Sequence, residues 1–267
     1  MSTSMTLSEL MIATRQRADM LPTGYTPSTS ATNYFVTDPE LISYINQSYF
    51  ELYDLLVQVY GDNYYVTDPV QFQTDGTSQL YPLPDGIRSF TNGITLNPFV
   101  PPPFFKLLGV DLSLSNTLDS FVTIRPFNFS DRNRYAVPNF QSFYGVTNLR
   151  YRIQGNQLWL TPIPSQGQTI QIWQIPRLTT LTNLGDTADG ISGWTEYIIC
   201  DGAIKCGQKE ETDVGVLMAQ KNALIQRIQS AAENRDAGSP PTVADHQYAD
   251  MWWPDGSGGG GGGSGVY

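Results

Sequence analysis

Apolar side chains recur at helical spacing in two segments near the N-terminus, 6–18 and 37–61. Each begins with a threonine followed three positions later by a glutamate, which is the spacing of a capping box. In the second segment Pro39 stands in the first turn and Gly61 ends the pattern. Both segments are therefore predicted to be amphipathic helices. The apolar stripe of the second consists of Leu41, Ile45, Tyr49, Leu52, Leu56 and Val59.

From about residue 66 to residue 176 the pattern changes to short alternating runs separated by turn residues. Gly155 and Asn156 mark a hairpin turn between two of these runs. Short strands in this number are typical of a small antiparallel barrel or sandwich. The proline-rich stretch 89–104 is predicted to be a long loop. The predicted strands are 70–74, 78–83, 104–114, 121–127, 149–154, 157–163 and 169–175.

Helical spacing returns in segments 192–211 and 212–238, the first capped by Ser192 and the second closed by Gly238. Two helices before the strands and two after them predict an α+β protein. In this prediction a four-helix bundle carries an inserted antiparallel β module and is followed by an extended C-terminal arm. The predicted parts are 1–65 and 191–238 for the two halves of the bundle, 66–190 for the β module and 239–267 for the arm.

Composition narrows the possible classes of protein. Of the 267 residues, 40% are hydrophobic and 15% are charged, which is typical of a folded chain. No apolar run approaches the roughly 18 residues of a membrane span, and the first ten residues do not resemble a secretion signal. The protein is therefore expected to be made in a cytoplasm. Its net charge of −10 argues against DNA binding through phosphate contacts.

Residues that carry catalysis or bind metals are scarce. The chain has one histidine, His246, and contains no phosphate-binding glycine loop, dinucleotide motif or Cys/His cluster. Cys200 and Cys206 lie six positions apart in a predicted helix, so they face different sides, which excludes a disulfide or a metal pair between them. Two pairs of carboxylates, Glu51 with Asp54 and Glu210 with Glu211, keep open the alternative of a peptidoglycan hydrolase. We expect these carboxylates to be solvated and the protein to be no enzyme, with no cofactor and no metal.

Arginine and aromatic residues concentrate between residues 123 and 152. This composition fits core and rim packing, a single-stranded nucleic-acid site or a contact with another protein. Because the rest of the chain is acidic, a protein contact is favoured over nucleic acid. The residues predicted to contact a neighbouring subunit or a tail protein are Arg125, Phe127, Arg132, Arg134, Tyr135 and Arg150; Arg152 and several aromatic residues lie among them.

The sequence "MWWPDGSGGGGGGSGVY", residues 251–267, combines two tryptophans with a run of six glycines. A glycine run is a flexible tether, whereas Trp and Tyr bury large areas and dominate interface energetics. Segment 239–267 contains no Lys or Arg and carries three aspartates. It is predicted to be an arm that anchors in a partner groove through Tyr248, Met251, Trp252, Trp253, Val266 and Tyr267.

Several stretches together resemble the head-to-tail adaptor proteins of tailed bacteriophages. They include "RPFNFSDRNRY", "RYRIQGNQLWLTPIP", "GWTEYIICDGAIKCGQKEETDVGVLMAQKNALIQRI" and "FVTDPELISYINQSYFELYDLLVQVYGDNYY", and the resemblance extends over residues 6–238. Their order and number carry the resemblance, since none is a catalytic signature. The sequence departs from the family pattern at 251–267 and in the longer insert 89–104.

This resemblance implies a structural virion protein at the head–tail interface. Family members form a dodecameric ring below the portal protein, extend the DNA channel and offer a surface to the next tail (nozzle) protein. A C-terminal extension commonly reaches onto the portal, which makes the portal the expected partner of the arm. Genomic DNA would pass through the ring without specific binding, in agreement with the acidic composition. No membrane is implied.

Overall fold

The computed structural model describes residues 5–61, 65, 68–87, 89–91, 98–113, 121–135, 149–188 and 193–233. The predicted arm, 239–267, lies outside this part, and the domain boundaries predicted at residues 65, 190 and 238 stay a prediction. The helices are α1 (Leu7–Arg17), α2 (Asp38–Tyr60), α3 (Arg132–Tyr135), α4 (Thr195–Lys209) and α5 (Gly215–Glu233), with a 3-10 helix η2 (Phe129–Asp131) before α3. The strands are β1 (Val70–Gln73), β2 (Leu80–Pro82), β3 (Phe90–Thr91), β4 (Pro98–Phe99), β5 (Phe104–Ser113), β6 (Phe121–Thr123), β7 (Arg125–Pro126), β8 (Arg150–Gln154), β9 (Gln157–Thr161) and β10 (Thr169–Pro176).

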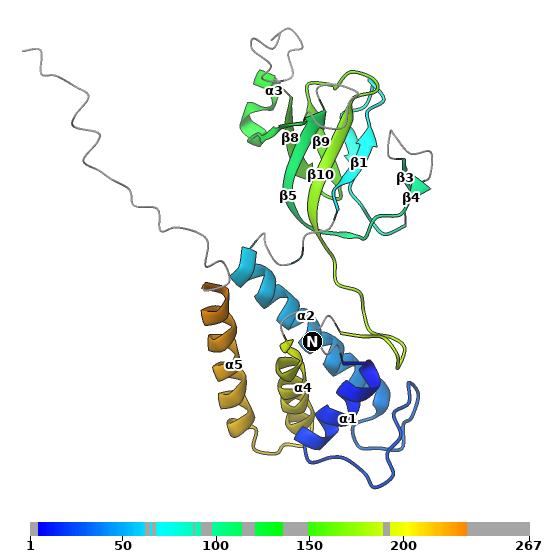
Figure 1. The fold of residues 1–267 in the computed structure, drawn as a ribbon, viewed down its shortest axis with the longest axis vertical. Helices are drawn as coiled ribbons and strands as arrows, with labels where there is room; N and C mark the ends of the chain where they lie inside the picture. The colour runs from blue at the N-terminus through cyan, green and yellow to red at the C-terminus, as the bar shows by residue number, and fades with distance from the viewer. Residues whose placement is uncertain are drawn as a thin grey trace, which may run out of the picture.

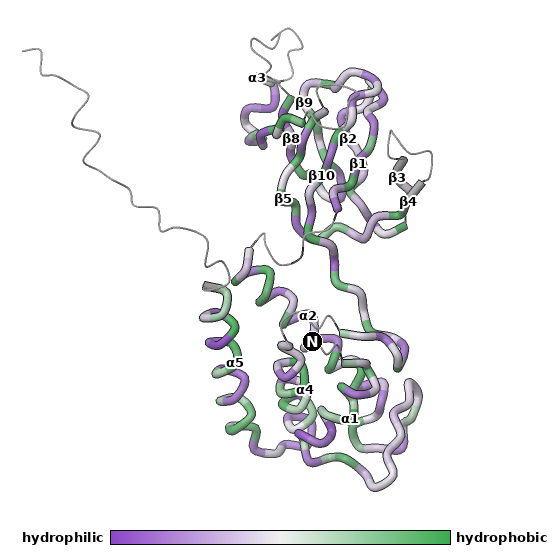
Figure 2. The backbone as a smooth tube through the Cα atoms, in the orientation of Figure 1, coloured by the Kyte–Doolittle hydropathy of each residue, from purple (hydrophilic) through white to green (hydrophobic). Residues whose placement is uncertain are grey.

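Helices α1 and α2 begin where their capping residues predict, whereas the N-cap of α4 is Trp194 and not the predicted Ser192, which lies outside the described residues. Thr6 caps α1 and Thr37 caps α2, and each threonine is paired with the glutamate three positions later in a complete capping box. Gly61 stands at the end of α2 with a φ of 61°, a left-handed conformation that favours glycine. Figure 2 shows apolar and polar residues alternating along α5, whose residues Leu224, Ile225 and Ile228 pack on the core of the helices.

The prediction of a four-helix bundle is wrong, although the protein is α+β. The described residues form five α-helices and two four-stranded sheets. Helix α4 lies at the centre and contacts α1, α2 and α5, and α1 runs obliquely to it (Figure 1). Gly202 permits this close crossing, because a Cβ atom added there would lie 3.0 Å from Cγ2 of Thr14 in α1. The helices therefore surround a central member and do not form four aligned neighbours around a common axis.

A buried ion pair fixes the loop between α1 and α2. Nη2 of Arg15 lies 2.8 Å from Oδ1 of Asp38, and the two side chains are 2% and 0% exposed. The hydroxyl of Tyr25 and the backbone N–H of Ser28 also donate to this carboxylate, at 2.7 and 3.1 Å. The guanidinium lies over the rings of Tyr25 and Tyr34. Burial opposes the charge of Arg15, but the hydrogen bonds to Asp38 and Tyr25 outweigh it and raise the pKa of the guanidinium.

The cap of α2 also joins this helix to α4. Oε2 of Glu40 accepts hydrogen bonds from Nζ of Lys209 at 2.7 Å and from the backbone N–H of Thr37 at 2.9 Å. The hydrogen bond from Lys209, followed by those from Thr37, lowers the pKa of Glu40 to about 2. Because an unfolded glutamate titrates near about 4.3, the unfolded state binds more protons than the folded state between these two values. Stability contributed by Glu40 is therefore present above this window and is lost as the pH falls through it.

Replacing Glu40 with Gln tests this coupling between protonation and folding. We expect the melting temperature of the parent protein to fall more steeply than that of Glu40→Gln between about pH 5 and about pH 2. The glutamine can still accept a hydrogen bond from Thr37, so the cap is largely kept. Calorimetry across this pH range measures the difference. Parallel loss of melting temperature in the two proteins would contradict the role assigned to the Glu40 carboxylate.

The two four-stranded sheets face one another across a shared apolar core. Their strand orders are β1-β10-β5-β6 and β2-β9-β8-β7, and the hairpin β8–β9 turns at the predicted Gly155 and Asn156. One pair, β7 with β8, is parallel, which departs from the predicted antiparallel module. The chain that joins these two strands passes through η2 and α3, so it is long enough for a parallel connection. The core contains Val70, Phe72, Tyr81, Leu83, Val110, Leu112, Ile124, Leu149, Leu158, Leu160, Ile170 and Ile172.

Within the predicted proline-rich loop, β3 and β4 form a two-stranded sheet of their own. The strands and the helices meet at the C-terminal half of α2, where Tyr53 and Val57 pack with Ile175 of β10. The hydroxyl of Tyr53 donates to the carbonyl of Pro176. Figure 1 shows the helices at one end of the molecule and the strands with α3 at the other. In the described part of the chain, no helix has both the length and the apolar character needed to cross a membrane.

Candidate interaction surface

The outer face of the sheet β2-β9-β8-β7 carries the candidate site. Across three neighbouring strands, Leu80 is the register partner of Trp159, and Trp159 is the partner of Arg152. Adjacent residues of β9 alternate between the faces of the sheet, so the buried Leu158 and Leu160 point into the core while Trp159 points outward. The strand pattern of the sequence thus places apolar, aromatic and cationic side chains in one row.

A stack of aromatic rings and guanidinium groups lies over this row. The ring of Trp159 packs edge-on against Phe127 and Phe129, with centroids 5.3 and 6.2 Å apart. The guanidinium groups of Arg132 and Arg152 lie 4.4 and 5.4 Å from the centroid of the Phe129 ring. Such cation–π contacts orient the two arginines while leaving their N–H groups able to donate to a ligand. We call the set Leu80, Phe129, Arg132, Arg152, Trp159 and Ile163 the arginine–tryptophan surface.

An open hollow of about 550 Å³ lies beside Trp159. Leu80 and Ile163 contribute apolar side chains to it and are 43% and 49% exposed. Its remaining lining comes from the turn before β2 and from Gln154 at the end of β8. A hollow of this size with an aromatic wall can accept a large apolar side chain.

The arginines of this surface are not neutralised by carboxylates in the described part of the chain. In the helices, by contrast, Arg15, Arg17, Lys205, Lys209 and Lys221 each form an ion pair with an aspartate or a glutamate. Among described residues no ion pair is formed by Arg125, Arg132, Arg134 or Arg152. An acidic protein therefore carries a cluster of arginines that form no ion pair with a described carboxylate, at the end of the molecule that holds the strands and α3.

The structure brings several of the predicted contact residues together. Arg125 is exposed on β7 and is the register partner of Arg150 on β8. Phe127 is 7% exposed, so it supports Trp159 from below and offers little surface of its own. Arg134 is exposed on α3. The side chain of Tyr135 lies outside the described part, as do the predicted arm residues Tyr248, Met251, Trp252, Trp253, Val266 and Tyr267.

Sequence reasoning missed Leu80, Trp159 and Ile163. The alternation of side chains along β2, β9 and the loop after β9 indicates that these residues share one face of the sheet. It does not indicate whether that face is buried or exposed. That assignment depends on the second sheet, because it covers the face that carries Leu158 and Leu160.

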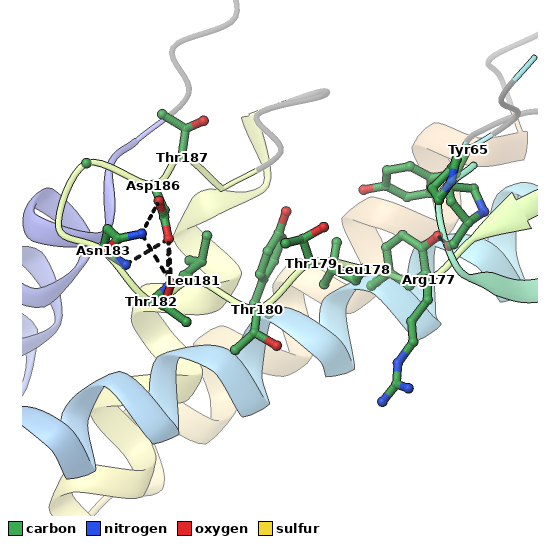
Figure 3. A pocket seen from close by; sticks show the side chains of 15 residues that line it. Tyr65, Arg177, Leu178, Thr179, Thr180, Leu181, Thr182, Asn183, Asp186 and Thr187 are labelled. Atoms are coloured by element: carbon green, nitrogen blue, oxygen red, sulfur yellow. Dashed lines mark hydrogen bonds between the residues drawn. The ribbon is translucent and has the colours of Figure 1, made fainter. Parts of the chain in front are cut away.

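A larger hollow, of about 810 Å³, lies where the segment 177–187 returns from β10 to the helices. Figure 3 shows Asp186 hydrogen-bonded to the turn that begins at Thr182, with Tyr65 at the far end of the hollow. Asp186 accepts from the backbone N–H groups of Thr182 and Asn183 at 2.7 and 2.8 Å. Hydrogen bonds from the backbone of Asn183 and then of Thr182 lower the pKa of Asp186. This carboxylate therefore holds the turn in place.

Of the four carboxylates considered for a hydrolase, one forms ion pairs between helices and three are exposed at the surface. Glu51 pairs with Lys205 at 2.9 Å and with Lys221 at 3.1 Å, and Asp54 is exposed on the same helix. Both lysines also bind the buried Asp201, so these four residues tie α2, α4 and α5 together. Glu210 and Glu211 are exposed at the end of α4. Within the described residues, no group of three or more His, Cys, Asp and Glu side chains is placed to hold a metal ion, and both cysteines are free and buried.

Unpaired arginines beside exposed aromatic and aliphatic side chains are typical of surfaces that bind other proteins. Together with a two-sheet module joined to a helical part, they make this surface a candidate contact site for another protein. Residues 5–244 match the family described as SU10 adaptor protein, and the chain belongs to this family. The resemblance to bacteriophage adaptor proteins is thereby confirmed, and the chain is a viral protein and a virion component. A comparison with curated proteins finds no match.

Proposed function

We propose that this adaptor connects the capsid to the tail as a ring below the portal protein. In this proposal a ring of twelve subunits extends the DNA channel at the head–tail interface. The observation that carries it is the cluster of Arg125, Arg132, Arg134 and Arg152, which form no ion pair among the described residues and lie with the strands and α3, away from α1, α2, α4 and α5. A connector needs two separate contact regions, and the cluster supplies one of them.

The second contact region is the arm, residues 239–267. Its 29 residues span roughly 95 Å when extended, and its tryptophans are suited to anchor in a groove of the portal protein. An arm that is ordered only on binding carries an entropy cost, which repeated contacts around a ring offset. Arg125, Phe127, Arg132, Arg134, Tyr135 and Arg150 then contact the downstream tail protein or the neighbouring subunit.

The net charge of −10 supports a channel role in this proposal. Packaged DNA must move through the ring without being held, and an acidic protein offers few partners to phosphate groups. No cofactor takes part, and no catalytic step is assigned.

Deleting residues 239–267 tests the proposal. We expect the intact protein mixed with purified portal rings to add a ring of density in negative-stain micrographs, and the deletion variant to add none. Replacing Trp252 and Trp253 with Ala is expected to weaken portal binding by at least about 30-fold, since a hot-spot residue contributes about 2 kcal/mol or more. Surface plasmon resonance on immobilised portal measures this change.

The matched control is Arg125→Gln combined with Arg134→Gln, which leaves the arm intact. This variant should bind portal as the parent does and lose affinity for the downstream tail protein. Equal portal binding by the deletion variant would rule out the arm as the docking element. Failure of the intact protein to form rings with portal would rule out the connector itself.

A further inference from the structure

The arginine–tryptophan surface has a composition that selects a particular kind of ligand. Arg132 and Arg152 present guanidinium groups that bind carboxylates in a planar, two-pronged geometry. Beside them, the hollow of about 550 Å³ between Leu80, Trp159 and Ile163 is large enough for an aromatic side chain. The matching ligand is a short peptide in which aromatic residues lie between carboxylates.

Single-stranded nucleic acid fits this surface less well. Stacking aromatics and arginines also serve such ligands, but here the hollow is walled by the aliphatic Leu80 and Ile163 as well as by Trp159. The net charge of −10 repels a phosphate chain that must approach the rest of the molecule. An acidic peptide of a few residues carries much less charge and is repelled correspondingly less.

The chain itself contains a peptide of this chemistry, Asp250-Met-Trp-Trp-Pro-Asp255. Two adjacent indoles stand between two carboxylates, and segment 239–267 has no lysine or arginine to oppose the surface. We propose that residues 250–255 dock on the arginine–tryptophan surface of their own chain in the free protein. The indole of Trp252 or Trp253 fills the hollow, and the flanking carboxylates pair with Arg132 and Arg152.

The position of the helices permits this docking. Helix α5 ends at Glu233 near the end of α2 that faces the strands (Figure 1). Sixteen residues, 234–249, separate Glu233 from Asp250, and such a segment spans up to roughly 53 Å. The longest strand, β5, has ten residues and is therefore about 33 Å long. The segment can thus reach along the whole height of the sheets.

Docking within one chain needs only a weak contact. A tethered segment has an effective concentration on the order of 1 mM, so a contact with a dissociation constant of about 0.1 mM is occupied roughly 90% of the time. The consequence is a protein that covers Trp252 and Trp253 together with Arg132 and Arg152. Withdrawal of the segment, by portal or by any other partner, uncovers the cluster. The inference concerns the free protein and does not depend on the proposed portal contact.

A labelled peptide competes with the tethered segment and so tests the inference without any partner protein. The probe is a fluorescein-labelled peptide of residues 244–257, and fluorescence anisotropy reports its binding to full-length protein. In the double variant Trp252→Ala, Trp253→Ala the surface is left open, so we expect it to bind the peptide about tenfold tighter than the parent does. Adding Arg132→Gln and Arg152→Gln to this variant should weaken binding at least about tenfold.

The matched control adds Arg177→Gln and Arg227→Gln, which lie outside the surface, and should leave peptide binding unchanged. A probe with asparagine in place of Asp250 and Asp255 should bind more weakly than the unmodified probe. Raising the salt concentration should weaken binding of the unmodified probe. Equal binding of the peptide to the parent and to the open variant would overturn the inference. So would unchanged binding after loss of Arg132 and Arg152, or binding of a single-stranded oligonucleotide where the peptide does not bind.

Discussion

Replacing Arg15 with Met is expected to lower the free energy of unfolding by about 3–5 kcal/mol. The carboxylate of Asp38 is fully buried and would lose its only cationic partner among the described residues. Two donors, Tyr25 and Ser28, would stay in place, but they cannot compensate a full charge on a side chain that is 0% exposed. The loop between α1 and α2 would lose its main attachment. Urea denaturation followed by circular dichroism at the helical band measures the change.

Two further variants separate charge burial from loss of packing. Arg17→Met breaks the exposed ion pair with Glu196 and should cost less than about 1 kcal/mol, because exposed pairs contribute little. Combining Arg15→Met with Asp38→Leu removes both charges, so this double variant should be more stable than Arg15→Met alone. If the double variant is less stable than Arg15→Met, the unpaired carboxylate of Asp38 is not the cause of the stability lost in Arg15→Met.

Replacing Leu158 with Ala is expected to destabilise the sheets by about 2–5 kcal/mol. Leu158 is 0% exposed and lies in the core shared by the two sheets. Its loss removes apolar contacts on both sides and leaves a cavity that neighbouring β-branched side chains fill only in part. Tryptophan fluorescence during urea denaturation follows this change, because Trp159 and Trp173 lie on β9 and β10.

Leu80→Ala is the matched control for the core variant. Leu80 lies on β2 of the same sheet, but it is 43% exposed on the outer face, so its loss should cost less than about 1 kcal/mol. The same variant should weaken binding of the 244–257 peptide, since Leu80 lines the hollow. Equal destabilisation by the two variants would contradict the assignment of inner and outer faces.

The sequence was sufficient to locate most elements, because local patterns specify them. The capping boxes at Thr6 and Thr37 are formed, and the hairpin turns at Gly155 and Asn156. All seven predicted strand runs contain strands of the structure. In each case the signal lies within a few residues, such as a hydroxyl three positions from a glutamate or a turn pair between alternating runs.

The packing of the helices could not be read in the same way. Helical spacing shows which face of each helix is apolar, but not the angle at which two helices cross. Nothing in the sequence around Gly202 indicates that it lies at a helix crossing. The structure shows that it packs against Thr14 of α1. Arginine is seldom fully buried, so no local pattern indicates that Arg15 lies in the core. Only its tertiary partner Asp38, 23 positions away, accounts for its place in the core.

The same distinction applies to the candidate site. By itself the sequence determined that arginines and aromatics concentrate in one stretch, that the chain is acidic, and that segment 239–267 combines tryptophans with aspartates. Only the tertiary structure decided that Arg152, Trp159 and Leu80 form one row, with Arg132 held above it by Phe129. The physical reason is that composition and periodicity are local properties, whereas the pairing of three strands and the choice of the buried face depend on the whole core.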